Sequence, residues 1–195
     1  MRQQFSLSIQ TDILLARSFI DMKQYEQAHQ IIEKLIADEP TAEAYYWLAQ
    51  VRGKEGDWDQ MERAIQKATV LEPENHRYRR FFFNLLKKKK KFESAELQLD
   101  LMIDNSEVPS ANLFSEKAWL RWKQKDYVAA AKAWQSAIRL KSDDADYYAR
   151  AAEAYVMIGD WPKAVEYYQK AARLDPQNTQ YKKRYREILG SDSEG

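Results

Sequence analysis

Two stretches of the chain, GDWDQMERAIQKATVLEP at residues 56–73 and GDWPKAVEYYQKAARLDP at residues 159–176, follow one pattern. They begin 103 residues apart, which is three steps of about 34 residues, a period that indicates stacked structural repeats. Three further copies fall at the other steps: KQYEQAHQIIEKLIADEP at 23–40, KKFESAELQLDLMIDNSE at 90–107 and KDYVAAAKAWQSAIRLKS at 125–142. We therefore expect five units, with the borders 9–41, 42–75, 76–110, 111–144 and 145–178.

Each unit is predicted to be a pair of helices joined by a short turn. Glycine and proline number only five each in 195 residues, which favours helices over many short strands. The second helix of every unit begins with an aromatic residue: Tyr25, Trp58, Phe92, Tyr127 and Trp161. Three positions later comes a small or flexible residue: Ala28, Met61, Ala95, Ala130 and Ala164. A proline, which a helix interior does not tolerate, closes three units at Pro40, Pro73 and Pro176.

The first helices also carry a small residue at one repeated place, namely Ala16, Ala49, Ala118 and Ala152. Small side chains on both helices of a pair allow the two axes to approach closely, while the aromatic residues fill the flanks. A single hairpin of this kind cannot bury its apolar faces, so the units are expected to stack on one another.

This arrangement resembles the tetratricopeptide repeat (TPR) family, whose pattern is W-x2-L-G-x2-Y…A-x3-F…P. The second unit matches it at Tyr45, Leu48, Ala49, Met61, Ile65 and Pro73, and the fifth at Tyr148, Ala152, Tyr155, Ala164, Tyr168 and Pro176. The resemblance covers residues 9–178 and implies an all-α fold, a right-handed α-solenoid of five TPR helix-turn-helix repeats. Residues 179–190, TQYKKRYREILG, are predicted to form a C-terminal capping helix, with a lead-in at 1–8 and a flexible tail at 191–195.

The middle of the chain departs from the pattern. The third unit has Phe83 where the others have alanine, lacks the closing proline, and is followed by one extra residue before the next aromatic. The fourth unit places Lys117 and Arg121 where apolar residues are expected. We therefore expect the least regular joint of the stack in this region.

Composition speaks against catalysis. The chain has no cysteine and only two histidines, His29 and His76, and it lacks a nucleophile–histidine–acid set, a glycine-rich phosphate loop and metal-ligand spacing. We expect a protein that is not an enzyme and needs no cofactor, metal or small-molecule substrate. No apolar run approaches the roughly 18 residues of a spanning helix, and no signal peptide is evident, so a cytoplasmic location is expected.

The resemblance also implies a site. In TPR proteins the first helices of successive repeats line a concave groove that binds peptides, and the corresponding positions of the first unit include Ile13, Leu14 and Arg17. From these positions we predict a peptide-binding groove of Tyr46, Trp47, Gln50, Arg77, Arg80, Phe81, Asn84, Lys88, Trp119, Trp122, Lys123 and Arg150. A clamp for the acidic tail of chaperones, known from part of the family, is not expected because Glu116 and Asp146 invert the required charge.

The net charge is only +1, but eight lysines and arginines and no acid lie within residues 76–91, around RRFFFNLLKKKKKF. This stretch can be a solvated helix end, where cations are favoured, a basic docking edge for an acidic partner, a nucleic-acid patch or a localisation signal. The predicted function is a non-catalytic module for protein–protein interaction, whose partner is a peptide or segment with apolar and acidic residues. Alternatives are self-association as an assembly scaffold and, more distantly, nucleic-acid binding through residues 77–91.

Overall fold

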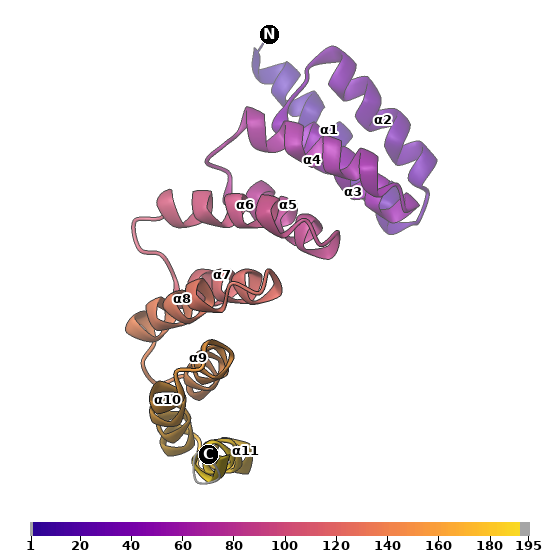
Figure 1. The fold of residues 1–195 in the computed structure, drawn as a ribbon. Helices are drawn as coiled ribbons and strands as arrows, with labels where there is room; N and C mark the ends of the chain where they lie inside the picture. Colours follow the sequence, from indigo (N-terminus) through magenta and orange to yellow (C-terminus); the bar gives the residue numbers. More distant parts are fainter. Residues whose placement is uncertain (1, 192–195) are drawn as a thin grey trace. The chain divides into compact units, whose positions relative to one another are not determined.

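The structure, a computed structural model, describes the backbone of residues 2–191 and the side chains of residues 9–190. Within residues 2–191 it consists of eleven α-helices without a strand (Figure 1), which confirms the all-α prediction. The helices are α1 (Arg2–Asp21), α2 (Tyr25–Asp38), α3 (Ala42–Glu55), α4 (Trp58–Leu71), α5 (His76–Lys88), α6 (Phe92–Asp104), α7 (Ala111–Lys123), α8 (Tyr127–Leu140), α9 (Ala145–Ile158), α10 (Trp161–Leu174) and α11 (Thr179–Ser191).

The chain divides into two compact units, an N-terminal unit (Met1–Lys91) and a C-terminal unit (Phe92–Gly195). In the N-terminal unit each of the helices α1 to α4 packs on the next, and α1 also contacts α3. In the C-terminal unit the same succession of contacts runs from α6 to α11. The border falls in the turn between α5 and α6, inside the third expected repeat.

The two ends of the chain are helical where the structure describes them. The lead-in expected at residues 1–8 is helical from residue 2 and continuous with α1. Most of the expected tail, residues 192–195, lies outside the described residues. The capping helix is present as α11, in which Ile188 is buried against the last helix pair while Tyr181 and Tyr185 pack beside it.

One backbone feature recurs in all five turns between the first and second helices. The residue two positions before the aromatic has a positive φ: Lys23 (61°), Gly56 (84°), Lys90 (58°), Lys125 (63°) and Gly159 (85°). Glycine adopts this left-handed conformation without steric cost, whereas a side chain costs roughly 1–2 kcal/mol. Three lysines therefore occupy turns for which glycine is the better residue.

The second helices begin with a capping residue where the sequence provides one. Asp57, Asp126 and Asp160 each accept a hydrogen bond from a backbone N–H three residues later. This satisfies a donor that the first turn of a helix leaves unpaired. Lys91 takes that place in the turn between α5 and α6, so its helix begins without an aspartate cap.

The predicted tight contact between paired helices is present. No solvent reaches the repeated alanines, which are Ala16, Ala28 and Ala49 in the N-terminal unit and Ala95, Ala118, Ala130, Ala152 and Ala164 in the C-terminal unit. The α3–α4 pair achieves the same approach differently. A Cβ added to Gly53 would lie 2.8 Å from the Sδ of Met61, so a glycine on α3 makes room for the methionine on α4.

The contact between α6 and α7 explains the charged residues at apolar positions. Lys117 Nζ lies 2.7 Å from Asp100 Oδ1, and Arg121 Nε lies 2.6 Å from Glu96 Oε1. The Glu96 residue is only 6% exposed, and its second oxygen accepts a hydrogen bond from Gln124. The sequence pattern predicted apolar residues at the positions of Lys117 and Arg121. Their carboxylate partners on α6 could not be identified from the sequence alone.

Replacing Lys125 with glycine should stabilise the protein by about 0.5–1 kcal/mol. The substitution removes the cost of a side chain at a φ of 63° but adds flexibility to the unfolded chain. Urea denaturation followed by circular dichroism measures the change. Gly56→Ala is the mirror experiment and should destabilise by about 1 kcal/mol, and a stability gain in that variant would contradict the argument.

Replacing Arg121 with methionine should lower the free energy of unfolding by about 2 kcal/mol, because Glu96 stays buried without its cation. The arginine is 33% exposed, which keeps the loss below that of a fully buried pair. The double variant Glu96→Leu/Arg121→Met should recover most of the loss, as measured by urea denaturation. Arg139→Met removes an exposed arginine of α8 that bonds to Ser136 and should change stability by less than about 0.5 kcal/mol.

Candidate functional site

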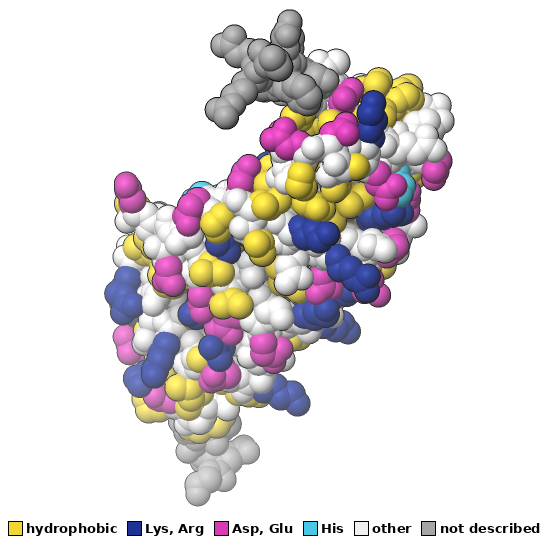
Figure 2. Space-filling model, turned by 90° about the horizontal axis from the view of Figure 1, so that it is seen from above, with side chains coloured by type: hydrophobic (Ala, Val, Ile, Leu, Met, Phe, Trp, Pro, Cys, Tyr) yellow, Lys and Arg dark blue, Asp and Glu magenta, His cyan; other side chains and the backbone are white. Residues whose placement is uncertain are grey.

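The candidate site of the N-terminal unit lies on its first helices. Residues of α1, α3 and α5 meet there in one contiguous aromatic and basic group, which we call the first-helix face: Arg17, Tyr46, Trp47, Arg77 and Phe81. The hydrophobic patches on the molecular face of Figure 2 likewise lie beside Lys and Arg side chains.

The aromatic residues of this face form a connected cluster. The ring of Tyr46 lies edge-on to Trp47 at 5.4 Å and to Phe81 at 5.3 Å between centroids. Its hydroxyl accepts a hydrogen bond of 2.6 Å from Gln50 Nε2. Tyr46 also packs on Tyr78, at 5.0 Å between ring centroids. Burial raises the pKa of the Tyr78 hydroxyl to about 12.

Trp47 is half-buried, and both packing and a hydrogen bond fix its side chain. It packs against Ile13 of α1 and its Nε1 donates to Glu43 Oε1 at 3.4 Å. The indole therefore has one packed side and one side that reaches the surface. A side chain fixed in this way loses little freedom when it contacts a partner.

Two arginines stack on this indole. The guanidinium carbon of Arg17 lies 5.1 Å from the Trp47 ring, and that of Arg77 lies 5.6 Å from Trp47 and 4.3 Å from Tyr46. Among residues 9–190, whose side chains are described, neither arginine is joined to an acid by an ion pair. A guanidinium that lies over an aromatic ring can still donate its N–H groups to a carboxylate.

The structure brings together only part of the predicted groove of the N-terminal unit. Tyr46, Trp47, Gln50, Arg77 and Phe81 belong to the connected group described above. The other three predicted residues are placed differently: Arg80 stacks on Phe83 at 5.4 Å, Lys88 lies 3.9 Å from the Trp58 ring, and Asn84 is exposed.

The predicted residues of the C-terminal unit fall into two groups. Trp119 lies edge-on to Phe92 at 5.9 Å, with the Lys123 ammonium 5.3 Å from its ring. Trp122 packs instead against Tyr127 and the buried cluster around Tyr168.

A pocket of about 330 Å³ lies beside Trp122, lined also by Met157, Tyr168 and Arg184. Burial raises the pKa of the Tyr168 hydroxyl to about 12. Arg150, the last predicted residue, is bound within its own helix, with its Nε 3.5 Å from Asp146 and its Nη1 3.2 Å from Glu153. Its charge is therefore already balanced.

Two lysines of the run form ion pairs with acids of α4. Lys89 Nζ lies 2.7 Å from Asp59 Oδ1 and 2.6 Å from Glu62 Oε2, and Lys91 Nζ lies 2.6 Å from Glu62 Oε1. The hydrogen bond from Lys89 lowers the pKa of Asp59. Burial alone would raise the pKa of Glu62, but the bonds from both lysines outweigh it and lower that pKa. The run thus closes the turn after α5 as part of an ion-pair network.

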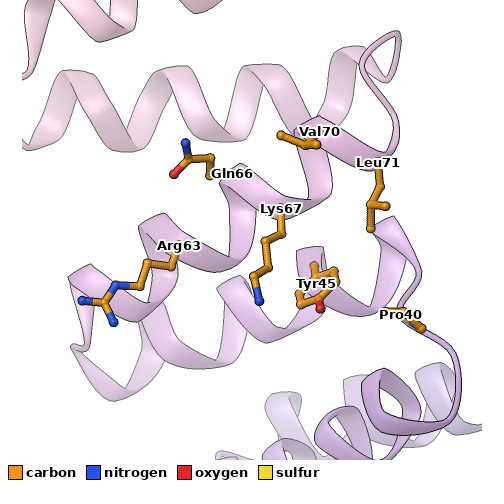
Figure 3. A pocket seen from close by; sticks show the side chains of 7 residues that line it. All are labelled: Pro40, Tyr45, Arg63, Gln66, Lys67, Val70 and Leu71. Carbon is orange, nitrogen blue, oxygen red and sulfur yellow. The ribbon is translucent and has the colours of Figure 1, made fainter.

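Two features of the surface stood outside the predicted site. Arg17 occupies a groove position of the first repeat, but its importance depends on Trp47, which follows 30 residues later. The second feature is a pocket beside α4 (Figure 3). Its sequence signal is the adjacent apolar pair Val70 and Leu71 at the end of α4.

Metal and membrane chemistry find no support in the described part of the chain. Residues 2–191 contain no group of histidines and acids arranged to hold a metal ion. They also contain no helix whose length and apolar content would allow it to cross a bilayer.

Comparison with known proteins gives one family and many structures. A family model described as tetratricopeptide repeat matches residues 13–60 and 115–179, more than half of the chain. Among curated proteins there is no match.

Similar solved structures share the fold at low sequence identity. YrrB, titled a TPR protein with an unusual peptide-binding site, aligns with a TM-score of 0.69 at 17% identity over 90% of each chain. MamA from Desulfovibrio magneticus RS-1 aligns with a TM-score of 0.66 at 15% identity over 87% of this chain and 96% of its own. PilF of Pseudomonas aeruginosa aligns with a TM-score of 0.57 at 18% identity over 95% and 89%.

Replacing Lys89 with methionine should flatten the pH dependence of stability in acid. The carboxyl pKa values of Asp59 and Glu62 are lowered in the folded state from ordinary values of 3.8 and 4.5. Their contribution is therefore complete above those values and is lost as the pH falls through the lower folded values. Urea denaturation between about pH 6 and pH 3 measures the slope.

The matched control for this experiment is Lys90→Met, at the exposed lysine between the two that bind acids. It keeps a side chain at the same positive φ and should leave the acid slope unchanged. If the free energy of unfolding falls with pH equally in the Lys89 variant and in the wild type, the ion pairs of Lys89 do not contribute to the acid dependence of stability.

Proposed function

Because the chain belongs to the tetratricopeptide repeat family, whose members are generally non-catalytic interaction modules, we propose that its first-helix face binds a segment of a partner protein. The segment carries apolar residues together with at least one aspartate or glutamate. The observation that carries this proposal is the stacking of two arginines without an acid partner on one half-buried tryptophan.

The apolar part of the proposal rests on the aromatic cluster. Trp47 and Phe81 are partly exposed, and the ring of Tyr46, which is only 6% exposed, supports both of them by edge contacts. Aromatic side chains of this kind provide a large contact area with few rotatable bonds, and they are common anchors of interfaces. A partner's leucine or aromatic side chain against Trp47 would complete its burial.

The acidic part rests on the geometry of the arginines. Arg17 and Arg77 approach the same indole from α1 and α5, so a carboxylate near Trp47 can be reached from two helices. Charge-assisted hydrogen bonds to arginine are stronger than neutral ones and are often bidentate. Since both guanidinium groups already lie over the aromatic rings, part of their ordering cost is met before a partner binds.

The C-terminal unit offers a different surface. Trp119 with Lys123, and the pocket beside Trp122, provide aromatic and apolar contacts, whereas Arg150 is already paired with acids. We assign this unit a second, mainly apolar role in binding.

Nucleic-acid binding through residues 77–91 has weaker support than the binding of a protein segment. Lys89 forms ion pairs with Asp59 and Glu62, and Lys91 forms one with Glu62. A nucleic-acid surface would need cations that are not balanced by neighbouring acids.

Selection from a random peptide library displayed on phage tests the proposal on the full chain. Selected peptides should be enriched in aspartate or glutamate next to apolar residues. Arg17→Gln and Arg77→Gln should each weaken a selected peptide by about tenfold, because each removes a charge-assisted hydrogen bond of roughly 1.5–3 kcal/mol. Fluorescence anisotropy with the labelled peptide measures the affinity.

Matched controls are Lys34→Gln, which removes an exposed cation of α2, and Trp161→Ala, which removes a 40% exposed tryptophan of α10. Both should bind like the wild type, and circular dichroism confirms that every variant is folded. Peptides that bind equally well to the wild type and to both arginine variants would falsify the assignment of this face.

A further inference from the structure

The pocket beside α4 is a concavity that the proposed function leaves unused. It has a volume of about 600 Å³. Figure 3 shows its residues projecting from successive turns of α4, with Tyr45 contributed by α3 and Pro40 by the α2–α3 connection. Its apolar part is unusually open to solvent, since Val70 is 72% and Leu71 is 50% exposed. Exposed apolar concavities of this kind mark interaction sites.

The pocket is basic as well as apolar. Arg63 and Lys67 line it, one turn apart on α4, and no acidic residue is among the lining residues. Lys67 Nζ lies 4.9 Å from the Tyr45 ring, and within residues 9–190 neither cation has an ion-pair partner. An occupant with a carboxylate next to apolar side chains would satisfy both parts of the pocket.

The chain itself contains a segment of this chemistry. In the α6–α7 loop, residues 105–110, Val108 is 81% exposed, the largest value among the exposed large hydrophobic residues of the described part of the chain. Glu107 precedes it and Pro109 follows it, and a residue before proline favours an extended backbone. This is the irregular junction in which the third repeat lacks its closing proline.

We propose that the α6–α7 loop of one copy of the protein docks into the α4 pocket of a second copy. Val108 and Pro109 pack against Tyr45, Val70 and Leu71, while Glu107 pairs with Arg63 and Lys67. The contact leaves the first-helix face unused, so it adds to the proposed function rather than depending on it.

The consequences follow from symmetry and size. Each copy carries one pocket and one loop, so the contact is head-to-tail and continues into chains or closes into rings. A single loop in a pocket buries less than the roughly 1,200 Å² at which stable interfaces begin, so association is weak, with a Kd on the order of 0.1 mM.

Sedimentation velocity on the full chain, from about 10 µM to about 1 mM, tests the contact across the range of weak association. The wild type should grow beyond a dimer as concentration rises. Val70→Asp destroys the pocket and Val108→Asp destroys the loop, and each variant alone should associate at least about tenfold more weakly. Both positions are exposed, and circular dichroism verifies folding.

The decisive arm is the mixture of these two variants. One retains a working loop and the other a working pocket, so an equimolar mixture should form a heterodimer that grows no further. The charge exchange Arg63→Glu/Glu107→Lys within one chain should restore association that either change alone weakens. Val128→Asp, which alters a 52% exposed valine of α8, is the matched control and should behave like the wild type.

Several results would overturn the proposal. A wild type that stays monomeric over the whole range removes it, and this includes the case in which the loop occupies the pocket of its own chain. If Val70→Asp and Val108→Asp both associate as strongly as the wild type, the contact lies elsewhere. A mixture of the two variants that does not form a dimer shows that loop and pocket do not meet.

Discussion

The close approach of paired helices at fully buried alanines is the constraint on which the rest of the structure depends. Alanine at Ala16, Ala49 or Ala152 has no exposed surface, so a larger side chain would have to push two helices apart. In this chain the paired helices are joined by short turns, and each of these turns has one residue in the left-handed conformation. Packing and turn therefore select the same hairpin for α1–α2, α3–α4, α7–α8 and α9–α10, and within each compact unit this repetition determines which side chains of the first helices lie side by side.

The lysines and arginines of this protein have two roles, which differ in whether the side chain contacts an acid or an aromatic ring. The conspicuous cations, Lys89, Lys91 and Arg121, bind acids of a neighbouring helix and hold consecutive helices together. The inconspicuous ones, Arg17 and Arg77, rest on an aromatic ring. A cation bound to an acid is already satisfied, whereas a stacked guanidinium keeps its hydrogen-bond donors for a ligand. The functional chemistry thus lies away from the densest run of positive charge.

Aromatic residues divide in the same way. Trp122 packs into the core of the C-terminal unit, while Trp47 is packed on one side only, between cations of two other helices. The α4 pocket lies on another part of the N-terminal unit, because most of its lining residues project from α4, with Tyr45 of α3 and Pro40 completing it. A repeat protein can separate contacts to different partners in this manner, since each helix pair has an inner, an outer and a lateral surface.

The sequence alone determined the fold class, the helix pairs and the positions of the turns, because these follow from local spacing: an aromatic, a small residue three positions later and a closing proline. It also determined which positions lie on the first helices, and hence Tyr46, Trp47, Arg77 and Phe81 as neighbours. Only the tertiary structure decided which charged side chains form ion pairs. Lys117 with Asp100, and Lys89 with Asp59, are 17 and 30 residues apart, and pairing over such distances depends on how side chains meet across stacked helices. The exposure of Val70 and of Val108 was decided in the same way, because burial is a property of what packs against a residue and not of the residue itself.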